Sequence, residues 1–554
     1  MITITMSKPV LSLFSLSLLL FASACFATRS EFDRLNQCQL DNINALEPDH
    51  RVESEAGLTE TWNPNHPELR CAGVTLIRRT IDPNGLHLPS FSPSPQLIFI
   101  IQGKGVLGLT VPGCPETYEQ PRSSQSRQES RKQQRDSHQK IRRFSKGDII
   151  AIPSGIPYWT YNNGDEPLVA ISLLDTSNIA NQLDSTPRVF YLGGNPEVEF
   201  PESQEEQQER QQQRPGLPVG RRAGKHQQEE NEGNSVLSGF SSEFLAQTFN
   251  TEEDTAKRLR SPRDKRSQIV RVEGGLRIIN PEGQEEDEER EQSHSHREEE
   301  EEYESPSREE EQESRRHKHS KEEGEEEDES RSHESRRWWR KESKEEKHGS
   351  HEQREDEQEE EKEEIRRSEG GKNGLEETIC SVKIRENIAH PARADLYNPR
   401  AGRISTANSL TLPILRNLRL SAEYVRLYRN GIYAPHWNIN ANSLLYVIRG
   451  EGRVRIVNSQ GNAVFDNKVR KGQLVVVPQN FVVAEQAGED EGLEYVVFKT
   501  NDRAAVNHVQ QVFRATPAEV LANAFGLRQR QVTELKLSGN RSPLVHPQSE
   551  SQSH

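Results

Sequence analysis

Two stretches of this 554-residue chain nearly repeat each other: residues 97–105 read LIFIIQGKG, and residues 444–452 read LLYVIRGEG. Two more pairs of segments follow in the same order. KGDIIAIP at 146–153 recurs as KGQLVVVP at 471–478, and EFLAQTF at 243–249 recurs as EVLANAF at 519–525. Three matching blocks in one order indicate the duplication of a whole domain rather than a short structural repeat.

The matching blocks also predict local structure. The first two are short apolar, β-branched runs bounded by Gly and Pro, which is typical of buried strands joined by tight turns. The third has helical spacing, and in its second copy Thr516 is a candidate N-cap, Pro517 the first helical residue and Glu519 the capping-box partner. The predicted fold is mainly β, with two jelly-roll β-barrels that are each followed by helices.

Three polar segments interrupt this plan. Residues 119–140 are rich in Arg, Gln and Ser, residues 201–232 in Gln, Glu and Arg, and residues 281–364 in Glu, Arg, Lys, Ser and His. Such segments bury too little apolar surface to offset roughly 1–2 kcal/mol of backbone entropy per ordered residue. They are predicted to be long disordered charged insertions, and the histidines of the third are interpreted as a solvated run rather than a metal site.

Charge divides the chain into two parts. Residues 374–554 contain 22 Lys and Arg against 16 Asp and Glu, a net charge of +6, which leaves −22 for residues 1–373. A mildly basic part beside a strongly acidic one is only weak support for nucleic-acid binding. No nucleic-acid partner is therefore predicted.

The first residues have the layout of a signal peptide. Lys8 gives a positive start, residues 10–21 form an apolar run, and Cys25-Phe-Ala27 places small residues where a signal peptidase cuts. We expect cleavage after Ala27 rather than after Ala24. The apolar run is short for a membrane span and no second run follows it, so no membrane anchor is predicted.

Four cysteines remain once this peptide is removed: Cys38, Cys71, Cys114 and Cys380. An even number of cysteines in the oxidising secretory pathway predicts two disulfides. All three possible pairings are compatible with the residues alone.

The segment Asn373-Gly-Leu-Glu-Glu-Thr-Ile-Cys380 resembles the processing junction of legumin-type (11S) seed storage globulins of the cupin superfamily. Residues 32–38 (FDRLNQC) and 73–75 (GVT) are also similar to that family. The resemblance covers essentially the whole mature chain outside the polar segments. It implies two fused cupin domains, nutrient storage without catalysis or cofactors, and transport through the endoplasmic reticulum to storage vacuoles or protein bodies of the seed.

The resemblance further implies that an asparaginyl endopeptidase cuts between Asn373 and Gly374, and that homotrimers of the precursor become hexamers. Asn-Gly is ordinarily a hairpin turn, but the charged sequence before it supplies no strand to pair, and an extended Asn followed by Gly is readily bound by a protease. The family pairs Cys38 with Cys71 and Cys114 with Cys380. One bridge would then join the acidic and basic chains.

Cupin domains often hold a metal through three His and one Glu, and the corresponding positions can be counted here. In the first barrel they fall on Ser90 and Ser92 (or on Pro89 and Phe91 in an alternative spacing), Gln96 and Tyr158. In the second barrel they fall on His436, Asn438, Ser443 and Val483. Hydroxyl and apolar groups cannot replace imidazole and carboxylate ligands, so no catalytic metal is predicted in either barrel. His436 is interpreted as a packed or hydrogen-bonded histidine.

The expected domain plan follows from these features. It comprises a signal peptide (1–27), an N-terminal cupin domain (28–200), a low-complexity linker (201–232), a helical extension (233–280), a disordered acidic tract (281–373), a C-terminal cupin domain with helices (374–540) and a flexible tail (541–554). A seed storage protein is the leading function. A secreted metalloenzyme of the germin or oxalate-oxidase kind, and a protein that binds a small ligand in a barrel cavity, are the alternatives.

Overall fold

The computed structural model describes residues 40–112, 114, 141–200, 234–260, 263–276, 382–538 and 541–547. The predicted signal peptide, the polar segments, Cys38, Cys380 and the junction at Asn373 and Gly374 lie outside these ranges. The chain separates into two units, and the larger one comprises Met1–Val111, Gln139–Ile278 and Val382–His554. Both barrels belong to this larger unit.

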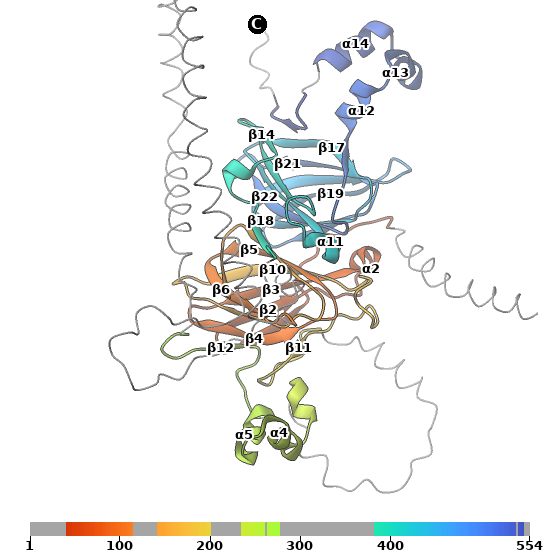
Figure 1. Cartoon of the computed structure of the whole chain (residues 1–554). Coiled ribbons are helices and arrows are strands. Elements are labelled where there is room, and N and C mark those ends of the chain that lie inside the picture. The colour runs from red at the N-terminus through yellow and green to blue at the C-terminus, as the bar shows by residue number, and fades with distance from the viewer. Residues whose placement is uncertain are drawn as a thin grey trace, which may run out of the picture. The chain divides into compact units, whose positions relative to one another are not determined.

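The first barrel, red to yellow in Figure 1, consists of two antiparallel sheets. Its strands are β1 (His50–Ser54), β2 (Gly57–Thr61), β3 (Val74–Ile81), β4 (Gly85–Phe91), β5 (Gln96–Gln102), β6 (Lys104–Leu109), β7 (Ile141–Ser145), β8 (Asp148–Ile152), β9 (Tyr158–Tyr161), β10 (Leu168–Asp175), β11 (Phe190–Tyr191) and β12 (Ile269–Arg271), joined by β13 (Arg385–Asn387). One sheet has the order β1-β2-β3-β10-β5-β8-β13, and the other has the order β11-β4-β9-β6-β7 with β12 paired to β4.

The second barrel, green to blue in Figure 1, repeats this plan. Its strands are β14 (Leu396–Asn398), β15 (Gly402–Ala407), β16 (Ser421–Leu427), β17 (Ile432–Asn438), β18 (Ser443–Val457), β19 (Ala463–Arg470), β20 (Leu474–Val477), β21 (Val482–Ala487), β22 (Leu493–Lys499), β23 (Val506–His508) and β24 (Leu544–Val545). They follow the order β14-β15-β16-β22-β18-β21-β17-β23, with β19 and β20 paired to β18 and β24 paired to β17.

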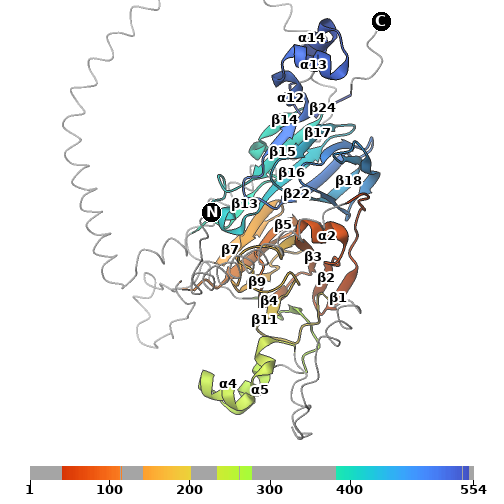
Figure 2. The same cartoon turned by 90° about the vertical axis from the view of Figure 1, so that its right-hand side faces the viewer.

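Helices lie at the two far ends of the stacked barrels, as both cartoon views show (Figures 1 and 2). They are α4 (Ser242–Phe249) and α5 (Glu253–Arg260) after the first barrel, and α12 (Val509–Ala515), α13 (Ala518–Phe525) and α14 (Gln529–Ser538) after the second; α2 (Pro67–Ala72) and α11 (Leu415–Leu418) are short helices within the barrels. None of the helices in the described ranges is both long and apolar enough to cross a membrane.

The duplication predicted from the sequence is confirmed by this arrangement. The blocks at 97–105 and 444–452 form β5–β6 and the start of β18, the second blocks form β8 and β20, and the third blocks form α4 and α13. The two copies differ at the glycine that ends the apolar run. Gly103, with φ of +84°, separates β5 from β6, whereas Gly450, with φ of +73°, lies within the longer β18. A Cβ atom on Gly450 would lie only 2.1 Å from the carbonyl oxygen of Gly492, so a larger residue would clash with the backbone there.

The helix predicted at residues 519–525 is confirmed as α13, but its predicted capping box is wrong. Thr516 ends α12 instead, where its hydroxyl donates to the carbonyl oxygen of Val512 (2.8 Å). Pro517 is the residue before α13, and no side chain caps that helix. In the first copy, by contrast, Ser241 caps α4 by accepting a hydrogen bond from the Phe244 N–H (3.2 Å). The copies therefore begin equivalent helices in different ways.

One buried apolar cluster runs through both barrels. The ring of Phe99 on β5 stacks on Tyr424 of β16 with centroids 6.0 Å apart, and Trp62 meets the edge of Tyr446 on β18, also at 6.0 Å. The guanidinium of Arg78 donates to the Tyr446 hydroxyl (2.9 Å). The barrels thus pack sheet against sheet across a shared core, in addition to a core inside the second barrel.

Candidate functional site

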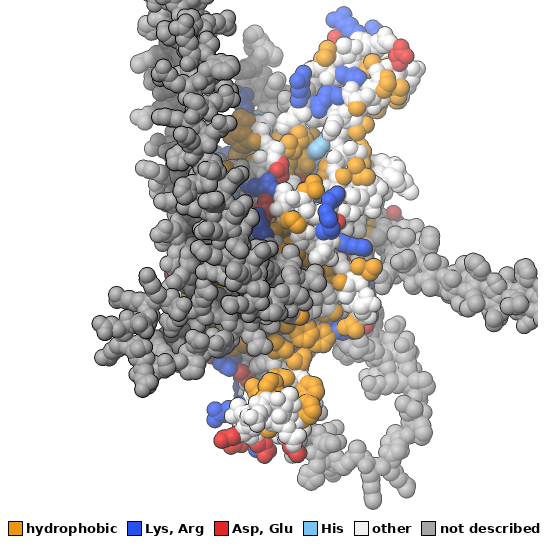
Figure 3. Space-filling model, viewed as in Figure 1, with side chains coloured by type: hydrophobic (Ala, Val, Ile, Leu, Met, Phe, Trp, Pro, Cys, Tyr) orange, Lys and Arg blue, Asp and Glu red, His pale blue; other side chains and the backbone are white. Residues whose placement is uncertain are grey.

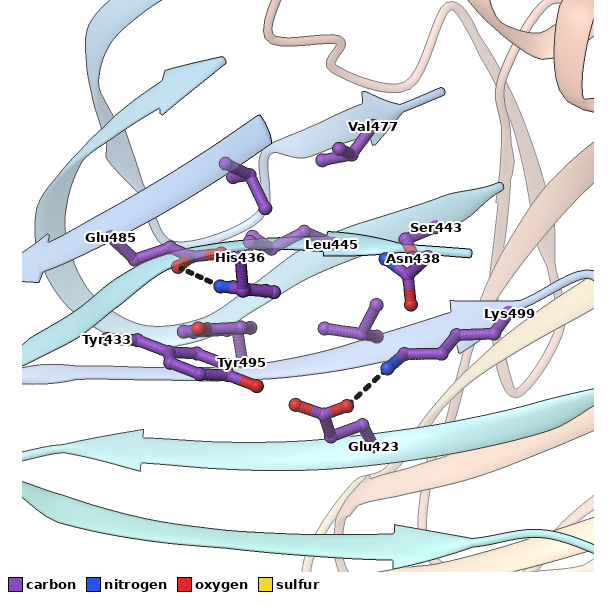
Figure 4. Close-up of a pocket in the computed structure, with 12 residues that line it drawn as sticks. Glu423, Tyr433, His436, Asn438, Ser443, Leu445, Val477, Glu485, Tyr495 and Lys499 are labelled. Atoms are coloured by element: carbon purple, nitrogen blue, oxygen red, sulfur yellow. Dashed lines mark hydrogen bonds and ion pairs between the residues drawn. The ribbon is translucent and has the colours of Figure 1, made fainter. Parts of the chain in front are cut away.

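The interior of the second barrel brings together all four residues that occupy cupin ligand positions there. His436 and Asn438 come from β17, Ser443 from β18 and Val483 from β21, and they line one pocket (Figure 4). His436 lies directly opposite Val483 in the β17–β21 register. Spacing along the sequence therefore grouped four residues that line one pocket of the barrel.

His436 has the surroundings of a packed, neutral histidine. Its Nδ1–H donates to the carbonyl oxygen of Ala434 (3.0 Å), and the Tyr433 ring stacks on the imidazole with centroids 3.9 Å apart. Burial, which disfavours the charged form, lowers the pKa of His436 to about 3. The ring is held in place by the protein whether or not anything binds to it.

The same pocket contains charged residues that the sequence did not single out. Glu423 of β16 and Lys499 of β22 form an ion pair whose side chains are 6% and 5% exposed. Glu485 of β21 has a carboxylate oxygen 3.9 Å from Nδ1 of His436 (Figure 4). Burial, and secondarily the negative charge of Glu423, raises the pKa of Glu485 well above its ordinary value, which favours the protonated carboxyl.

Four buried oxygens around this pocket have no hydrogen-bond partner among the described residues. They are Oδ1 of Asn438, Oγ of Ser443, Oε2 of Glu485 and Oη of Tyr495. A buried polar atom without a partner costs about 1–3 kcal/mol. The pocket is therefore lined by polar groups whose hydrogen-bonding capacity the surrounding protein does not use.

The donor set does not suit a transition metal. Among the four counted positions only His436 offers a group that a transition metal prefers, since an amide, a hydroxyl and an isopropyl group occupy the other three, and the nearby Glu423 is paired with Lys499. Within the described ranges, no group of three or more His, Cys, Asp or Glu is placed to hold a metal ion.

In the first barrel, three of the four counted positions lie together. Ser90 of β4 is opposite Tyr158 of β9, and the Tyr158 hydroxyl donates to Oε1 of Gln96 on β5 (3.1 Å). Ser92 lies just beyond the end of β4, where its hydroxyl oxygen accepts the N–H of Ser94 (3.2 Å). Tyr158, Gln96 and Ser92 thus bond to one another or to the backbone, whereas the buried Ser90 hydroxyl has no hydrogen-bond partner among the described residues.

A second buried polar cluster in the first barrel was not predicted. Arg79 of β3 pairs with Glu199 (2.9 Å), whose side chain is 3% exposed, and the Tyr191 hydroxyl donates to the same carboxylate (2.6 Å). His87 contacts the Tyr191 hydroxyl (3.2 Å), and burial lowers its pKa well below the ordinary value. The first barrel also has an interior pocket, and Arg79 and His87 are among the residues that line it. Glu199 belongs to the segment after β11, so a later part of the chain supplies the carboxylate that pairs with the Arg79 guanidinium.

Cys71 and Cys114 each take part in a disulfide. Cys38 and Cys380 lie outside the described residues, as do Ala27, Asn373 and Gly374. The predicted pairing and both predicted cleavage sites therefore stay predictions.

Comparison with known proteins supports one family over nearly the whole chain. The Cupin family model matches residues 43–197 and 386–533. The chain is 80% identical to "Legumin J" of Pisum sativum over 99% of this chain and 100% of that protein, and 59% identical to "Glycinin G4" of Glycine max over 98% of each. It also superimposes on a structure titled "11S globulin from Wrightia tinctoria reveals auxin binding site", with a TM-score of 0.66 and 32% identity over 92% of this chain and 97% of that one.

Proposed function

The chain belongs to the legumin-type 11S seed storage globulins of the cupin superfamily, and we propose that its precursor is cut after Asn373 and packed as a hexamer of disulfide-linked chains. It is a seed storage protein, a reservoir of nitrogen and carbon, and not an enzyme. It is oligomeric and is stored in protein bodies. The observation that carries this conclusion is the identity with Legumin J along the full length of both chains.

Cleavage between Asn373 and Gly374 by an asparaginyl endopeptidase fits the strand plan. The nearest described strand before the junction is β12, which ends at Arg271, and the nearest one after it is β13, which begins at Arg385. A cut at residue 373 would therefore leave every described strand intact. We propose that the precursor enters the endoplasmic reticulum through residues 1–27, loses them after Ala27, and reaches the storage vacuole.

The disulfides proposed for the processed protein are Cys38–Cys71 and Cys114–Cys380. Cys71 packs against the buried cluster that contains Leu40, which is two residues from Cys38 in sequence. Val111 and Val382, three and two residues from Cys114 and Cys380, both pack against the other buried cluster. These placements support the family pairing over the two alternatives.

Exposed apolar side chains on the helices at the two ends of the subunit favour assembly. Phe244 and Phe249 of α4 are 53% and 54% exposed, and Val520 and Phe525, which occupy the same positions of the repeated block in α13, are 53% and 54% exposed. Figure 3 shows apolar side chains at the surface of both ends. Because equivalent patches lie at opposite ends of one subunit, we propose that α4 of one copy packs near α13 of the next and closes a trimer.

Cleavage is proposed to control the step from trimer to hexamer. The tract before Asn373 carries dense charge and is tethered at both ends in the precursor. If it lies over one face of the trimer, stacking two such faces would crowd like charges and confine chain, and both effects are unfavourable. Cutting after Asn373 frees one end of the tract and uncovers that face.

A gel of protein taken from seed tests the covalent part of this proposal. Without reductant the mature protein should run as one species, and reduction should release an acidic chain of residues 28–373 and a basic chain of residues 374–554. A single band that survives reduction would contradict cleavage, and two bands without reductant would contradict the interchain bridge.

A second candidate function is the binding of a small polar molecule in the second barrel. The specific observation is the set of unpartnered buried oxygens on Asn438, Ser443, Glu485 and Tyr495. Protein from seed can be denatured and the released small molecules identified by mass spectrometry. We expect one molecule per chain from wild type and none from Asn438→Leu/Ser443→Val. Wild-type protein that releases nothing would rule this function out.

A further inference from the structure

Each barrel is completed by a segment that comes from the other side of the proposed cleavage site. We call residues 40–47 the acidic arm and residues 382–389 the basic arm. We propose that these exchanged arms, together with the shared core, hold the processed acidic and basic chains in one folded particle without any disulfide. The inference rests on cleavage at Asn373 and goes beyond it, because it assigns the interface between the two products.

The acidic arm is built into the second barrel. The Ile43 N–H donates to the carbonyl oxygen of Val464 in β19 (2.9 Å). Leu46 and Leu474 of β20 exchange both of their backbone hydrogen bonds (2.8 and 2.9 Å). Leu40 and Ile43 belong to the buried cluster of the second barrel, and Ile43 is 2% exposed. The arm therefore contributes a bridge at the edge of the sheet and apolar side chains to its core.

The basic arm is built into the first barrel through backbone hydrogen bonds to β8. Its strand β13 pairs antiparallel with β8, with Arg385 opposite Ile150 and Asn387 opposite Asp148. The Ala151 N–H donates to the Ile384 carbonyl (2.8 Å) and the Ile388 N–H to the Gly147 carbonyl (3.0 Å).

Side chains also attach the basic arm to the first barrel. Ile384 and Ile388 are 5% and 0% exposed, and both belong to the large shared cluster. Arg385 pairs with Asp148 (3.3 Å), whose side chain is 1% exposed. A side chain of the first barrel also bonds to the arm, because the guanidinium of Arg142 on β7 donates to the Val382 carbonyl (2.7 Å). Removing the arm would expose two isoleucines and leave the edge of β8 without its partner.

The shared core adds contacts that also cross from one product to the other. Phe99 and Trp62 lie before the junction, and their aromatic partners Tyr424 and Tyr446 lie after it. The side-chain amide of Asn178 donates to the Leu418 carbonyl (2.8 Å) in the same way. Separation of the chains would therefore require both arms to leave and a sheet-to-sheet interface to open.

This interface changes how the stored protein is expected to come apart. Reduction removes a covalent tether but none of the contacts above, so reduction alone should not release the chains. Proteolysis within an arm removes part of a barrel core and should release them. The exchanged arms thus make disassembly depend on proteases rather than on redox conditions.

The test uses the full chain with Cys380→Ser, which removes the one cysteine of the basic chain and so any interchain disulfide whatever the pairing. The protein is cut with asparaginyl endopeptidase, its remaining free thiol is blocked, and it is run on native size-exclusion chromatography with light scattering. We expect both chains in equal amounts in one peak with the mass of the cut wild type. Separate acidic and basic peaks would overturn the proposal. A denaturing gel reports cleavage itself, and if residue 373 resists the enzyme, an inserted site for another protease at 373–374 provides the cut.

Arm variants in the same background test which contacts matter. Ile43→Asp and Ile388→Asp should each lower the urea concentration at which the cut chains separate, by at least 1 M relative to Cys380→Ser alone. Glu47→Ala is the matched control, because this acidic-arm residue has a 54% exposed side chain that makes an exposed ion pair with Arg470 and accepts an exposed hydrogen bond from Gln473. The uncut variants should keep the native elution volume, which shows that they fold. Equal separation midpoints for Ile43→Asp and Glu47→Ala would exclude the acidic arm from the interface.

Discussion

Replacing Glu485 with glutamine should remove a pH-dependent loss of stability that the buried Glu485 carboxyl causes in the wild-type protein. Burial raises the pKa of Glu485 well above its ordinary value, so the folded protein holds a proton that the unfolded chain releases above about pH 4.3. The contribution of this group to stability is fully present below that pH and is lost as the pH rises toward the raised pKa. The loss is about 1.4 kcal/mol per pH unit. Glu485→Gln has no proton to release and avoids this loss.

The free energy of unfolding of Glu485→Gln should therefore rise relative to wild type as the pH increases. The gap should open at about pH 4.3 and grow by about 1.4 kcal/mol for each pH unit up to the raised pKa of Glu485. Urea unfolding of the uncut precursor at pH 4, 5, 6 and 7 measures it, provided that the urea dependence of both proteins has the same slope. Protonation of His436 at low pH changes the free energy of unfolding of both proteins alike, so this contribution largely cancels in the difference.

Glu451→Gln is the matched control, because Glu451 lies in the same barrel on β18 with a side chain that is 55% exposed. Its difference from wild type should stay constant over the same pH range. If the gap for Glu485→Gln is also constant, or shrinks as the pH rises, Glu485 is not a buried, protonated carboxyl and the description of the pocket is wrong.

Three further outcomes follow from the structure. Lys499→Met should lower the free energy of unfolding by about 3–5 kcal/mol, because it leaves the buried carboxylate of Glu423 unpaired, and adding Glu423→Leu should recover most of the loss in urea unfolding. Elemental analysis should find no stoichiometric Mn, Fe, Zn or Cu, and a metal in the first barrel that is lost with Tyr158→Phe would contradict this interpretation of the ligand positions. Phe525→Glu on α13 should shift the uncut protein from trimer toward monomer in sedimentation, whereas Leu410→Glu, which replaces a 70% exposed residue away from the terminal helices, should not.

Much of the architecture could be predicted because the two halves of the chain repeat. The blocks around Leu97 and Leu444 are apolar, β-branched runs that end in glycine, and both form the central strands of their barrels. Spacing within the repeated motifs also grouped His436 with Val483, and both line one pocket. Local pattern and spacing are sufficient where strands of fixed length surround a barrel.

The charged residues of the pocket could not be found in this way. Strand β16 is buried along almost its whole length, because one face lines the barrel and the other meets the neighbouring barrel. An alternating pattern cannot tell which face holds Glu423, and its partner Lys499 is 76 residues away in sequence. Only the fold shows that these two charges neutralise each other.

Capping and arm exchange were missed for related reasons. Thr516 has the sequence signature of a helix start, yet its hydroxyl is used to end the preceding helix. The acidic arm carries Leu40, Ile43 and Leu46 among polar residues and has no strand periodicity. Its partners Val464 and Leu474 lie more than four hundred residues further along the chain, so no local signal identifies them.

Sedimentation of Asn373→Gln tests the central proposal most directly. Asparaginyl endopeptidase should cut wild-type precursor but not this variant. After treatment, analytical ultracentrifugation should find wild type as hexamers and Asn373→Gln as trimers, with the difference reduced at high salt because salt screens the charged tract. Stable hexamers of uncut Asn373→Gln, formed as readily as those of wild type, would show that cleavage is not the switch for assembly.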